Sequence, residues 1–406
     1  MSFTGHAPGS AEYRRLIAGL FFAGVATFAQ LYSPQAVLPQ IAAGLQVEPA
    51  TAALTVSAAT LGIAAAVIPW SLAADRIGRV PVMTIGVFAA TALGVAAPLS
   101  EGIAAMLVVR LLEGAALGAV PAVALAYLSE EVDARFTATA AGSYIAGTTV
   151  GGLSGRIVSG LVGEATDWRW GVWAVAAMCA ASAALFVSLI PRARGFTTMR
   201  VGGDQASRIA ERLREPLRSA RLWALYAQGF LLMGAFVAAY NYLGFHLAAE
   251  PFSLPGWLVT LLFLAYLAGT VSSPWAGILA SRIGRFPVLL ASIGTMMLGA
   301  VLMIAPGPVV VLAGLLLFTA GFFGAHAIAS GWTPVAAGSL GRAQASSLYY
   351  LAYYAGSSLF GWALGLVFGD AGWPAFVVMI LVMCVLAAGA AVLALRPRGP
   401  HAGTED

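Results

Sequence analysis

The chain alternates long apolar stretches with short polar segments. Most of the apolar stretches reach about twenty residues, the length that a helix needs to cross the hydrocarbon core of a bilayer. Twelve such stretches lie near residues 16–38, 51–72, 80–98, 103–128, 137–162, 169–190, 221–247, 256–280, 286–305, 308–333, 343–367 and 373–395. This pattern predicts an all-α integral membrane protein with twelve transmembrane helices.

The amino-acid composition indicates the same class of protein. Hydrophobic residues make up 60% of the 406 residues and charged residues only 9%, with a mean hydropathy of +0.88, whereas soluble domains carry about 25% charge. All 21 basic residues are arginine. Without lysine the chain cannot form a nucleotide-binding P-loop, which needs a lysine on the phosphates. We expect no ATP site and no enzymatic activity, and no cofactor, metal or nucleic acid partner.

Two similar charged turns mark equivalent points of two halves. The segments SLAADRIGR (71–79) and GILASRIGR (277–285) each lie between two apolar stretches and place Arg76 and Arg282 206 residues apart. Glycine permits the backbone angles of such a turn, and arginine keeps its charge next to lipid. The repeat predicts two six-helix bundles. The expected divisions are an N-terminal tail 1–15, an N-terminal bundle 16–190, a linker 191–220, a C-terminal bundle 221–395 and a C-terminal tail 396–406.

The arginines are distributed unequally between the two sides of the predicted membrane protein. Eighteen arginines fall in the tails, the linker and the loops on the side of the termini, whereas the opposite loops contain only Arg169. Cytoplasmic loops of membrane proteins carry the excess of basic residues. We therefore expect both termini to face the cytoplasm.

The first charged turn resembles the signature loop of the major facilitator superfamily, Gly-x-Leu-Ala-Asp-Arg-x-Gly-Arg-Arg, between the second and third helices. Ser281 replaces the aspartate in the second copy, so only the first half offers the acidic contact. The resemblance implies that the loop pairs with charges on neighbouring helix ends and closes one side of a transporter. The alternative is that its arginines only anchor the helices at the surface. The implied gate residues are Asp75, Arg76, Gly78, Arg79, Arg282, Gly284 and Arg285.

Three charged residues fall inside predicted helices, where charge is costly and is a functional hypothesis by default. Arg110 and Glu113 lie three residues apart on one helix face, close enough to pair. Arg156 on the next helix is expected in the same layer, so that Glu113 would lie between two cations. The alternative is a fixed ion pair that never changes its protonation.

The segment from Arg110 to Gly114, RLLEG, resembles the superfamily motif Arg-x-x-Gln-Gly, which is linked to proton coupling in drug-proton antiporters. Glutamate stands here in place of glutamine. A buried glutamate can take up and release a proton as its pairing changes. The resemblance therefore implies that Glu113, with Arg110 and Arg156, couples transport to protons, and His326 is a second proton-site candidate, although a neutral core histidine is the alternative there.

A glycine-rich segment on the fifth predicted helix resembles the antiporter motif Gly-x-x-x-Gly-Pro-x-x-Gly-Gly. Glycines four residues apart allow two helices to approach closely, and this spacing alone is an alternative explanation. The resemblance favours an exporter of the twelve-helix drug-proton antiporter family. The segment LYSPQAVLPQIAAGLQV (31–47) is further similar to the bacterial arabinose-efflux-permease-like subgroup, which implies a location in a bacterial inner membrane. The glycine motif comprises Gly147, Gly151, Gly152 and Gly155.

Polar and aromatic side chains on three helices are candidates for a substrate cavity, because helices one, seven and eleven line the cavity in the fold that the resemblance implies. Aromatic rings with hydroxyl tips suit an amphiphilic ligand, although such a stripe also occurs as core packing. The candidates are Gln30, Tyr32, Gln35, Tyr240, Asn241, Tyr350, Tyr353 and Tyr354.

These features together predict a secondary transporter that exports a small organic or amphiphilic molecule by alternating access, in exchange for protons. The alternative is a proton-coupled importer or a facilitator of a small metabolite, because fold does not fix direction. The expected partners are a small-molecule substrate, protons and the lipid bilayer. The resemblance implies a monomer.

Overall fold

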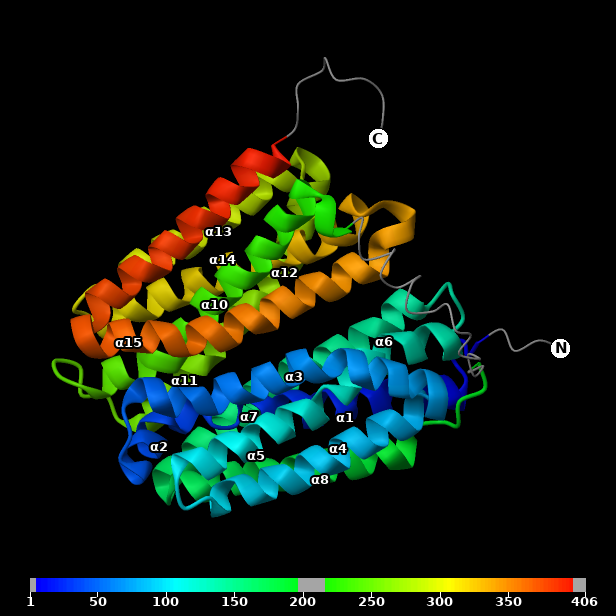
Figure 1. The fold of residues 1–406 in the computed structure, drawn as a ribbon, viewed down its shortest axis with the longest axis horizontal. Helices are drawn as coiled ribbons and strands as arrows, with labels where there is room; N and C mark the ends of the chain where they lie inside the picture. Colours follow the sequence, from blue (N-terminus) through cyan, green and yellow to red (C-terminus); the bar gives the residue numbers. More distant parts are fainter. Residues whose placement is uncertain (1–4, 196–215, 397–406) are drawn as a thin grey trace. The chain divides into compact units, whose positions relative to one another are not determined.

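The computed structural model describes residues 5–195 and 216–396. Most of the predicted linker and the ends of both predicted tails lie outside these residues. The described chain is helical throughout the predicted spans (Figure 1). Its elements are α1 (Ala11–Tyr32), η1 (Gln35–Val37), α2 (Leu38–Leu45), α3 (Pro49–Ile77), α4 (Arg79–Ala96), η2 (Ala97–Leu99), α5 (Ile103–Leu117), α6 (Ala119–Glu131), α7 (Thr137–Ala165), α8 (Trp168–Leu189), α10 (Ala220–Ala248), α11 (Gly256–Leu261), η3 (Leu262–Tyr266), α12 (Leu267–Ile283), α13 (Arg285–Leu302), α14 (Pro308–Ala336) and α15 (Gly338–Leu395).

Ten helical segments within the described ranges are long and apolar enough to cross a membrane. Helix α7 is a further long helix, with 29 residues, and it packs against α1 and α8. The long α15 segment breaks at Gly372, where φ is +74°, and folds back as two helices, orange and red in Figure 1. Ten segments, α7 and the second half of α15 together make twelve spans, which confirms the fold class that the sequence predicts.

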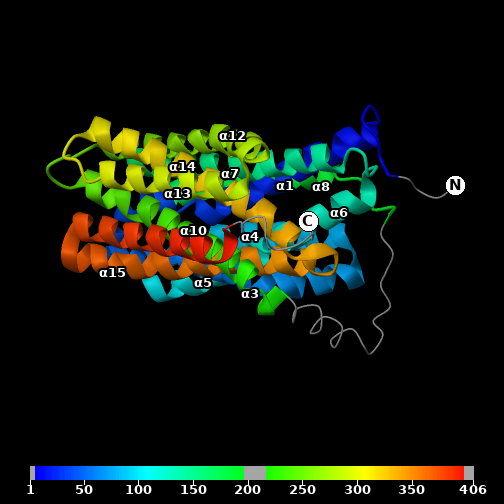
Figure 2. The same cartoon turned by 90° about the horizontal axis from the view of Figure 1, so that it is seen from above.

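The chain forms two compact units. Unit 1 contains Met1–Val201 and Leu243–Phe263, and unit 2 contains Gly202–Tyr242 and Leu264–Asp406. In unit 1, α1 packs along α7 and α8, and α3 packs along α5. In unit 2, α14 lies between α12 and α13, and α13 and α14 run side by side (Figures 1 and 2). Each unit thus buries its own helix faces.

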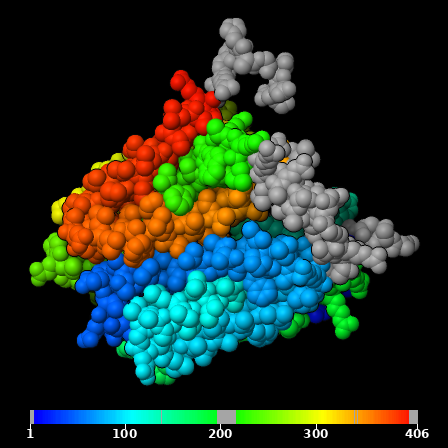
Figure 3. Space-filling model, in the orientation of Figure 1, coloured from blue at the N-terminus to red at the C-terminus, as the bar shows by residue number. Residues whose placement is uncertain are grey.

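Apolar side chains fill the core of unit 1 and also cover its outer face. Leu16, Tyr127 and Phe186 belong to a buried cluster that joins α1, α6 and α8. Large apolar residues are exposed on the opposite faces of α3 and α4, for example Ile68 and Phe88. These two helices form part of the blue-to-cyan surface in Figure 3. Because a soluble protein rarely exposes so many large apolar side chains together, this surface suits hydrocarbon.

The two charged turns have the same backbone conformation. Gly78 ends α3 with φ +98° and ψ 158°, and Gly284 ends α12 with φ +90° and ψ 158°. A positive φ is unfavourable for residues with a Cβ atom, so glycine is required at both turns. The repeat seen in the sequence is therefore also a repeat of local structure.

Candidate functional site

The first charged turn contains a buried arginine between two carboxylates. Arg79 Nη1 lies 2.6 Å from Asp75 Oδ1, and Arg79 Nη2 lies 2.9 Å from Glu130 Oε1 at the end of α6. Arg76 is exposed and makes no ion pair among the described residues. Glu130 is not among the predicted gate residues, although the resemblance implies a charge on a neighbouring helix end. The arrangement ties the start of α4 to the ends of α3 and α6.

The second charged turn lacks both carboxylates. Ser281 stands at the repeat position of Asp75, and Ala336 stands at that of Glu130. Arg282 and Arg285 are exposed and form no ion pair within 4.0 Å among the described residues. The two turns therefore share a backbone but differ in their electrostatics.

The loop between α6 and α7 carries a second ion pair at the same end of unit 1. Arg135 Nη2 donates to Asp133 Oδ2 over 2.7 Å. The hydrogen bonds from the Arg135 side chain and backbone lower the pKa of Asp133 to about 2. The carboxylate of Asp133 therefore stays charged at neutral pH.

The charged residues of α5 form an ion pair in the interior of unit 1. Arg110 Nη1 lies 2.6 Å from Glu113 Oε2, and the side chains are 1% and 0% exposed. Arg110 also donates to three backbone carbonyls from two other helices: Nε to Thr55 at 2.9 Å, Nη1 to Gln30 at 3.3 Å and Nη2 to Leu31 at 2.6 Å. Its positive charge is thus held by one carboxylate and three carbonyl dipoles.

The second oxygen of Glu113 faces the Gln30 side chain. Among the described residues, Glu113 Oε1 and both polar atoms of the Gln30 side chain are buried without a hydrogen bond of ordinary geometry. The Gln30 amide lies close to the Glu113 carboxylate, and it fills the space left by the missing side chain of Gly94 on α4. The Cys179 thiol of α8 also lies within range of electrostatic interaction with Glu113. Cys179 is not among the predicted site residues. Glu113 thus pairs with Arg110 through one oxygen and borders the Gln30 amide with the other, without an aligned hydrogen bond there. This is an unusual arrangement, because buried polar atoms are normally bonded.

Arg156 is buried in unit 1 and contacts polar and aromatic groups of α1, η1 and α7. Its Nε donates to Gln35 Oε1 at 2.6 Å and its Nη1 to the carbonyl of Gly152 at 2.6 Å. Its guanidinium also covers the Tyr32 ring at 4.0 Å and approaches the Phe263 ring at 5.5 Å. Gln35 and Tyr32 of the α1–η1 segment thus contact Arg156. The expectation that Glu113 lies between two cations stays a prediction.

The glycines of α7 form a close contact with α1. A Cβ atom on Gly147, Gly151 or Gly155 would overlap the backbone of Phe21, Val25 or Ala29, one after another along α1. Gly152 faces away from this contact and borders the Arg156 side chain. The spacing of four residues places the three glycines on one face of α7. Close packing accounts for these three positions, and a role in export stays a prediction.

We expect Gly151→Ala to destabilise the protein by about 1–3 kcal/mol, because the new methyl group overpacks a backbone contact. The built Cβ would lie 2.6 Å from the Val25 carbonyl oxygen. Gly142 on the same helix is a matched control, since nothing lies within 4 Å of its Cβ position. Gly142→Ala should be neutral or slightly stabilising. Thermal unfolding of both purified variants measures the difference, and equal unfolding temperatures would contradict a close α1–α7 contact.

Unit 2 contains a continuous aromatic cluster. The Tyr240 hydroxyl and the Thr319 hydroxyl share a hydrogen bond of 2.7 Å. The centre of the Tyr240 ring lies 5.0 Å from that of Phe236 and 4.7 Å from that of Tyr266. Phe236, Tyr266 and Phe322 are not among the predicted cavity residues, since aromatic residues are common in any apolar helix. The cluster comprises Phe236, Tyr240, Tyr266, Phe322, His326, Tyr349 and Tyr353.

His326 and the tyrosines of α15 meet at one end of this cluster. His326 Nδ1 lies 2.9 Å from the Tyr349 hydroxyl, and the His326 ring stacks on Phe322. Tyr353 lies 5.0 Å from the His326 ring, whereas Tyr350 is 46% exposed and Tyr354 is buried. The bonded His326 nitrogen fits a core histidine, and a role for His326 in proton transfer stays a prediction.

Asn241 joins two helices of unit 2. Its Nδ2 donates to the Gly361 carbonyl at 3.1 Å, and the neighbouring Tyr242 hydroxyl donates to the same oxygen at 2.9 Å. Both residues are buried. These bonds tie α10 to α15, so Asn241 has a structural role beside any contact with a substrate.

The apolar helices of the described residues, the repeated charged turn and the buried ion pair are typical of a multi-pass membrane transporter. The sequence profile of the Major Facilitator Superfamily matches residues 20–360. The chain belongs to this family.

Curated relatives and a solved structure agree with this assignment. The chain is 37% identical to the inner membrane transport protein YnfM of Escherichia coli, over 93% of this chain and 90% of that protein. It is 34% identical to the uncharacterized MFS-type transporter YybF of Bacillus subtilis, over 93% of each. The nucleoside transporter NupG has a similar fold, with a TM-score of 0.77 at 16% identity, over 94% of this chain and all of that chain. These proteins are transporters and not enzymes.

Proposed function

We propose that this protein is a proton-coupled secondary transporter of a bacterial inner membrane that exports a small organic or amphiphilic molecule by alternating access. In this proposal the protein acts as a monomer with both termini in the cytoplasm. It belongs to the drug-proton antiporter group and is related to arabinose-efflux-like permeases. The observation that carries the proposal is the buried carboxylate of Glu113 inside a transmembrane helix, which pairs with Arg110 through one oxygen and borders the Gln30 amide with the other.

The chemistry of this carboxylate supports proton coupling. Charge is costly within a bilayer, and Glu113 is fully buried with a counter-charge on one oxygen only. The Gln30 amide beside it carries both a donor and an acceptor. The amide N–H group suits the charged carboxylate, and the amide oxygen suits the protonated acid. The site can therefore accommodate Glu113 in both protonation states, as a coupling residue requires.

The surroundings of Glu113 limit which other groups can take part in proton transfer. The charged or titratable side chains that face it are Arg110 from its own helix and Cys179 from α8. Helix α1 contributes the Gln30 amide, and α3 contributes the Thr55 carbonyl that holds Arg110. We infer that a proton on Glu113 weakens its ion pair with Arg110, and that movement of α1 or α3 changes the pairing in turn.

The aromatic cluster of unit 2 supports an amphiphilic substrate. Rings present apolar faces, and the hydroxyl groups of Tyr240 and Tyr349 provide polar tips. In unit 1, Gln35, Tyr32 and Arg156 offer an amide, an aromatic face and a cation. We propose these residues as substrate contacts, and the turn containing Asp75, Arg79 and Glu130 as a gate.

The test uses full-length protein in liposomes that enclose a pH-sensitive dye, with a panel of amphiphilic drugs, sugars and organic anions. We expect a substrate gradient to drive protons in the opposite direction, and a proton gradient to drive uphill movement of that substrate. Empty liposomes and protein without substrate are the controls. Substrate movement that is indifferent to the proton gradient would instead show a facilitator, and movement of protons with the substrate would show a symporter.

A further inference from the structure

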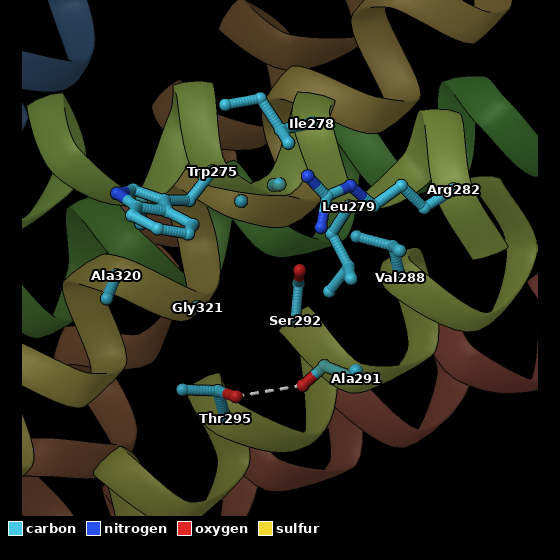
Figure 4. Close-up of a pocket in the computed structure, with 13 residues that line it drawn as sticks. Trp275, Ile278, Leu279, Arg282, Val288, Ala291, Ser292, Thr295, Ala320 and Gly321 are labelled. Carbon is cyan, nitrogen blue, oxygen red and sulfur yellow. Dashed lines mark hydrogen bonds between the residues drawn. The ribbon is translucent and has the colours of Figure 1, made fainter. Parts of the chain in front are cut away.

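A crevice opens between α12, α13 and α14 of unit 2. Its volume is about 320 Å³, at the lower end of the range for small-molecule sites. Trp275, Leu279 and Arg282 of α12 form one wall, and Ser292 of α13 and Gly321 of α14 lie across from them (Figure 4). The Arg282 side chain points into the crevice. Trp275 is 67% exposed at its rim.

The corresponding place in the first repeat is filled by a tryptophan. Trp70 precedes Arg76 by six residues, and its Nε1 donates to the Ala115 carbonyl of α5 at 2.7 Å. Trp70 also packs against the core of unit 1. An indole thus closes the space between the second, third and fourth helices of the first half.

The second repeat has no indole at this place, because its tryptophan lies one residue earlier in the repeat. The position six residues before Arg282 is Ala276, which is buried and lines the crevice, and Gly321 stands at the repeat position of Ala115. Trp275 comes one residue earlier, which turns its side chain by about 100° around the helix. The crevice is therefore the space that an indole occupies in the other half.

The charge at this crevice also differs from that of the first repeat. In the first turn Asp75 and Glu130 neutralise Arg79. In the second turn Ser281 and Ala336 replace both acids, and Arg282 and Arg285 have no acidic partner among the described residues. Arg282 lies seven residues beyond Trp275, so the apolar rim continues about 10 Å along α12 from the cation.

We propose that this crevice binds an anionic phospholipid, with the headgroup phosphate at Arg282 and an acyl chain along Trp275 and Leu279. The occupant follows from the charge and the surroundings. Arg282, which has no acidic partner among the described residues, attracts an anion, and the exposed Arg285 lies three residues further along the chain. The exposed wall of α12 is apolar, and anionic lipids are amphiphiles that membrane proteins meet in the bilayer. Free phosphate would leave the apolar rim unused. The proposal does not depend on the direction of transport or on proton coupling.

The experiment measures lipid binding by native mass spectrometry of the full-length protein in an uncharged detergent. Phosphatidylglycerol and phosphatidylcholine with identical acyl chains are titrated separately. We expect the wild type to retain one phosphatidylglycerol at concentrations where phosphatidylcholine is lost. Arg282→Gln should weaken this binding about fivefold, as expected for one basic residue at a lipid headgroup. Arg76→Gln is the matched control, because Arg76 is the exposed arginine next to the space that Trp70 fills in the first repeat. This variant should bind lipid like the wild type.

A second variant moves the tryptophan to the position that it has in the first repeat. The double substitution Trp275→Ala and Ala276→Trp should place an indole in the crevice and abolish the retained lipid. Size-exclusion chromatography and thermal unfolding check that this variant folds, and Arg282→Gln tests the proposal independently because Arg282 is exposed. Equal retention of the two lipids, equal losses in Arg282→Gln and Arg76→Gln, or full retention by a folded double variant would each overturn the proposal.

Discussion

Replacing Glu113 by glutamine is expected to uncouple substrate movement from the proton gradient while leaving the protein folded. Glutamine has the shape of glutamate and keeps an oxygen for the 2.6 Å contact with Arg110 Nη1. Arg110 also keeps its three carbonyl acceptors, so its charge does not become isolated. Glutamine cannot take up a proton at neutral pH. Proton movement driven by substrate should therefore fall by about a hundredfold, as for loss of an essential proton-transfer group.

The measurement compares two assays in the same liposomes. Proton movement is followed with the enclosed dye, and proton-independent exchange is followed with labelled substrate on both sides. Exchange should remain within about twofold of the wild type if only the proton step is lost. Glu12→Gln, a substitution of an exposed carboxylate in the first turn of α1, is the control. If Glu113→Gln retains proton-driven transport, the ion pair is structural and coupling lies elsewhere.

The sequence predicted the helices and the local pairs because both depend on short intervals. Apolar stretches define the spans, and Arg110 and Glu113 are neighbours on one helix turn. The partners that hold Arg110 could not be predicted in this way, because the carbonyls of Thr55, Gln30 and Leu31 are main-chain groups of distant helices. Main-chain acceptors are present at every residue, so the sequence carries no signal for the ones that are used.

The partners of Arg156 could not be predicted for a related reason. The position of Arg156 along α7 correctly predicts a buried cation. Position along the helix does not predict toward which neighbouring helix the side chain is directed. The contact of Gly151 and Gly155 with α1 sets the rotation of α7, and Arg156 then meets Gln35 and Tyr32. The crevice of unit 2 similarly depends on one residue of shift between Trp70 and Trp275. That shift is visible in the sequence. The resulting crevice could be inferred only from the structure, which shows the hydrogen bond that holds the Trp70 indole in the first repeat.

Removing Arg110 should have the largest effect on stability. Arg110→Leu leaves the Glu113 carboxylate buried without its counter-charge and deprives three carbonyls of a donor. Breaking a buried ion pair from one side costs about 3–5 kcal/mol. The variant should therefore unfold at a markedly lower temperature than the wild type in detergent. Arg76→Leu, which removes an exposed arginine without an ion pair, is the control and should change the unfolding temperature little.

The loss should also depend on pH, with a sign that follows from proton linkage. Without Arg110, Glu113 remains buried more easily when it carries a proton, so the folded variant binds more protons than the unfolded chain. Stability then falls as pH rises, and the gap between Arg110→Leu and the wild type should widen between pH 5 and pH 8.

The double variant Arg110→Leu with Glu113→Leu separates the fold from the function of this pair. Replacing both members of a buried ion pair by apolar residues is often neutral or stabilising, so the double variant should regain most of the lost stability and lose the pH dependence. It should nevertheless show no proton-coupled transport, since no titratable carboxyl remains at this site. A double variant as unstable as Arg110→Leu would mean that the three carbonyls, and not Glu113, are what Arg110 stabilises. A stable double variant that still couples would assign the proton to another residue.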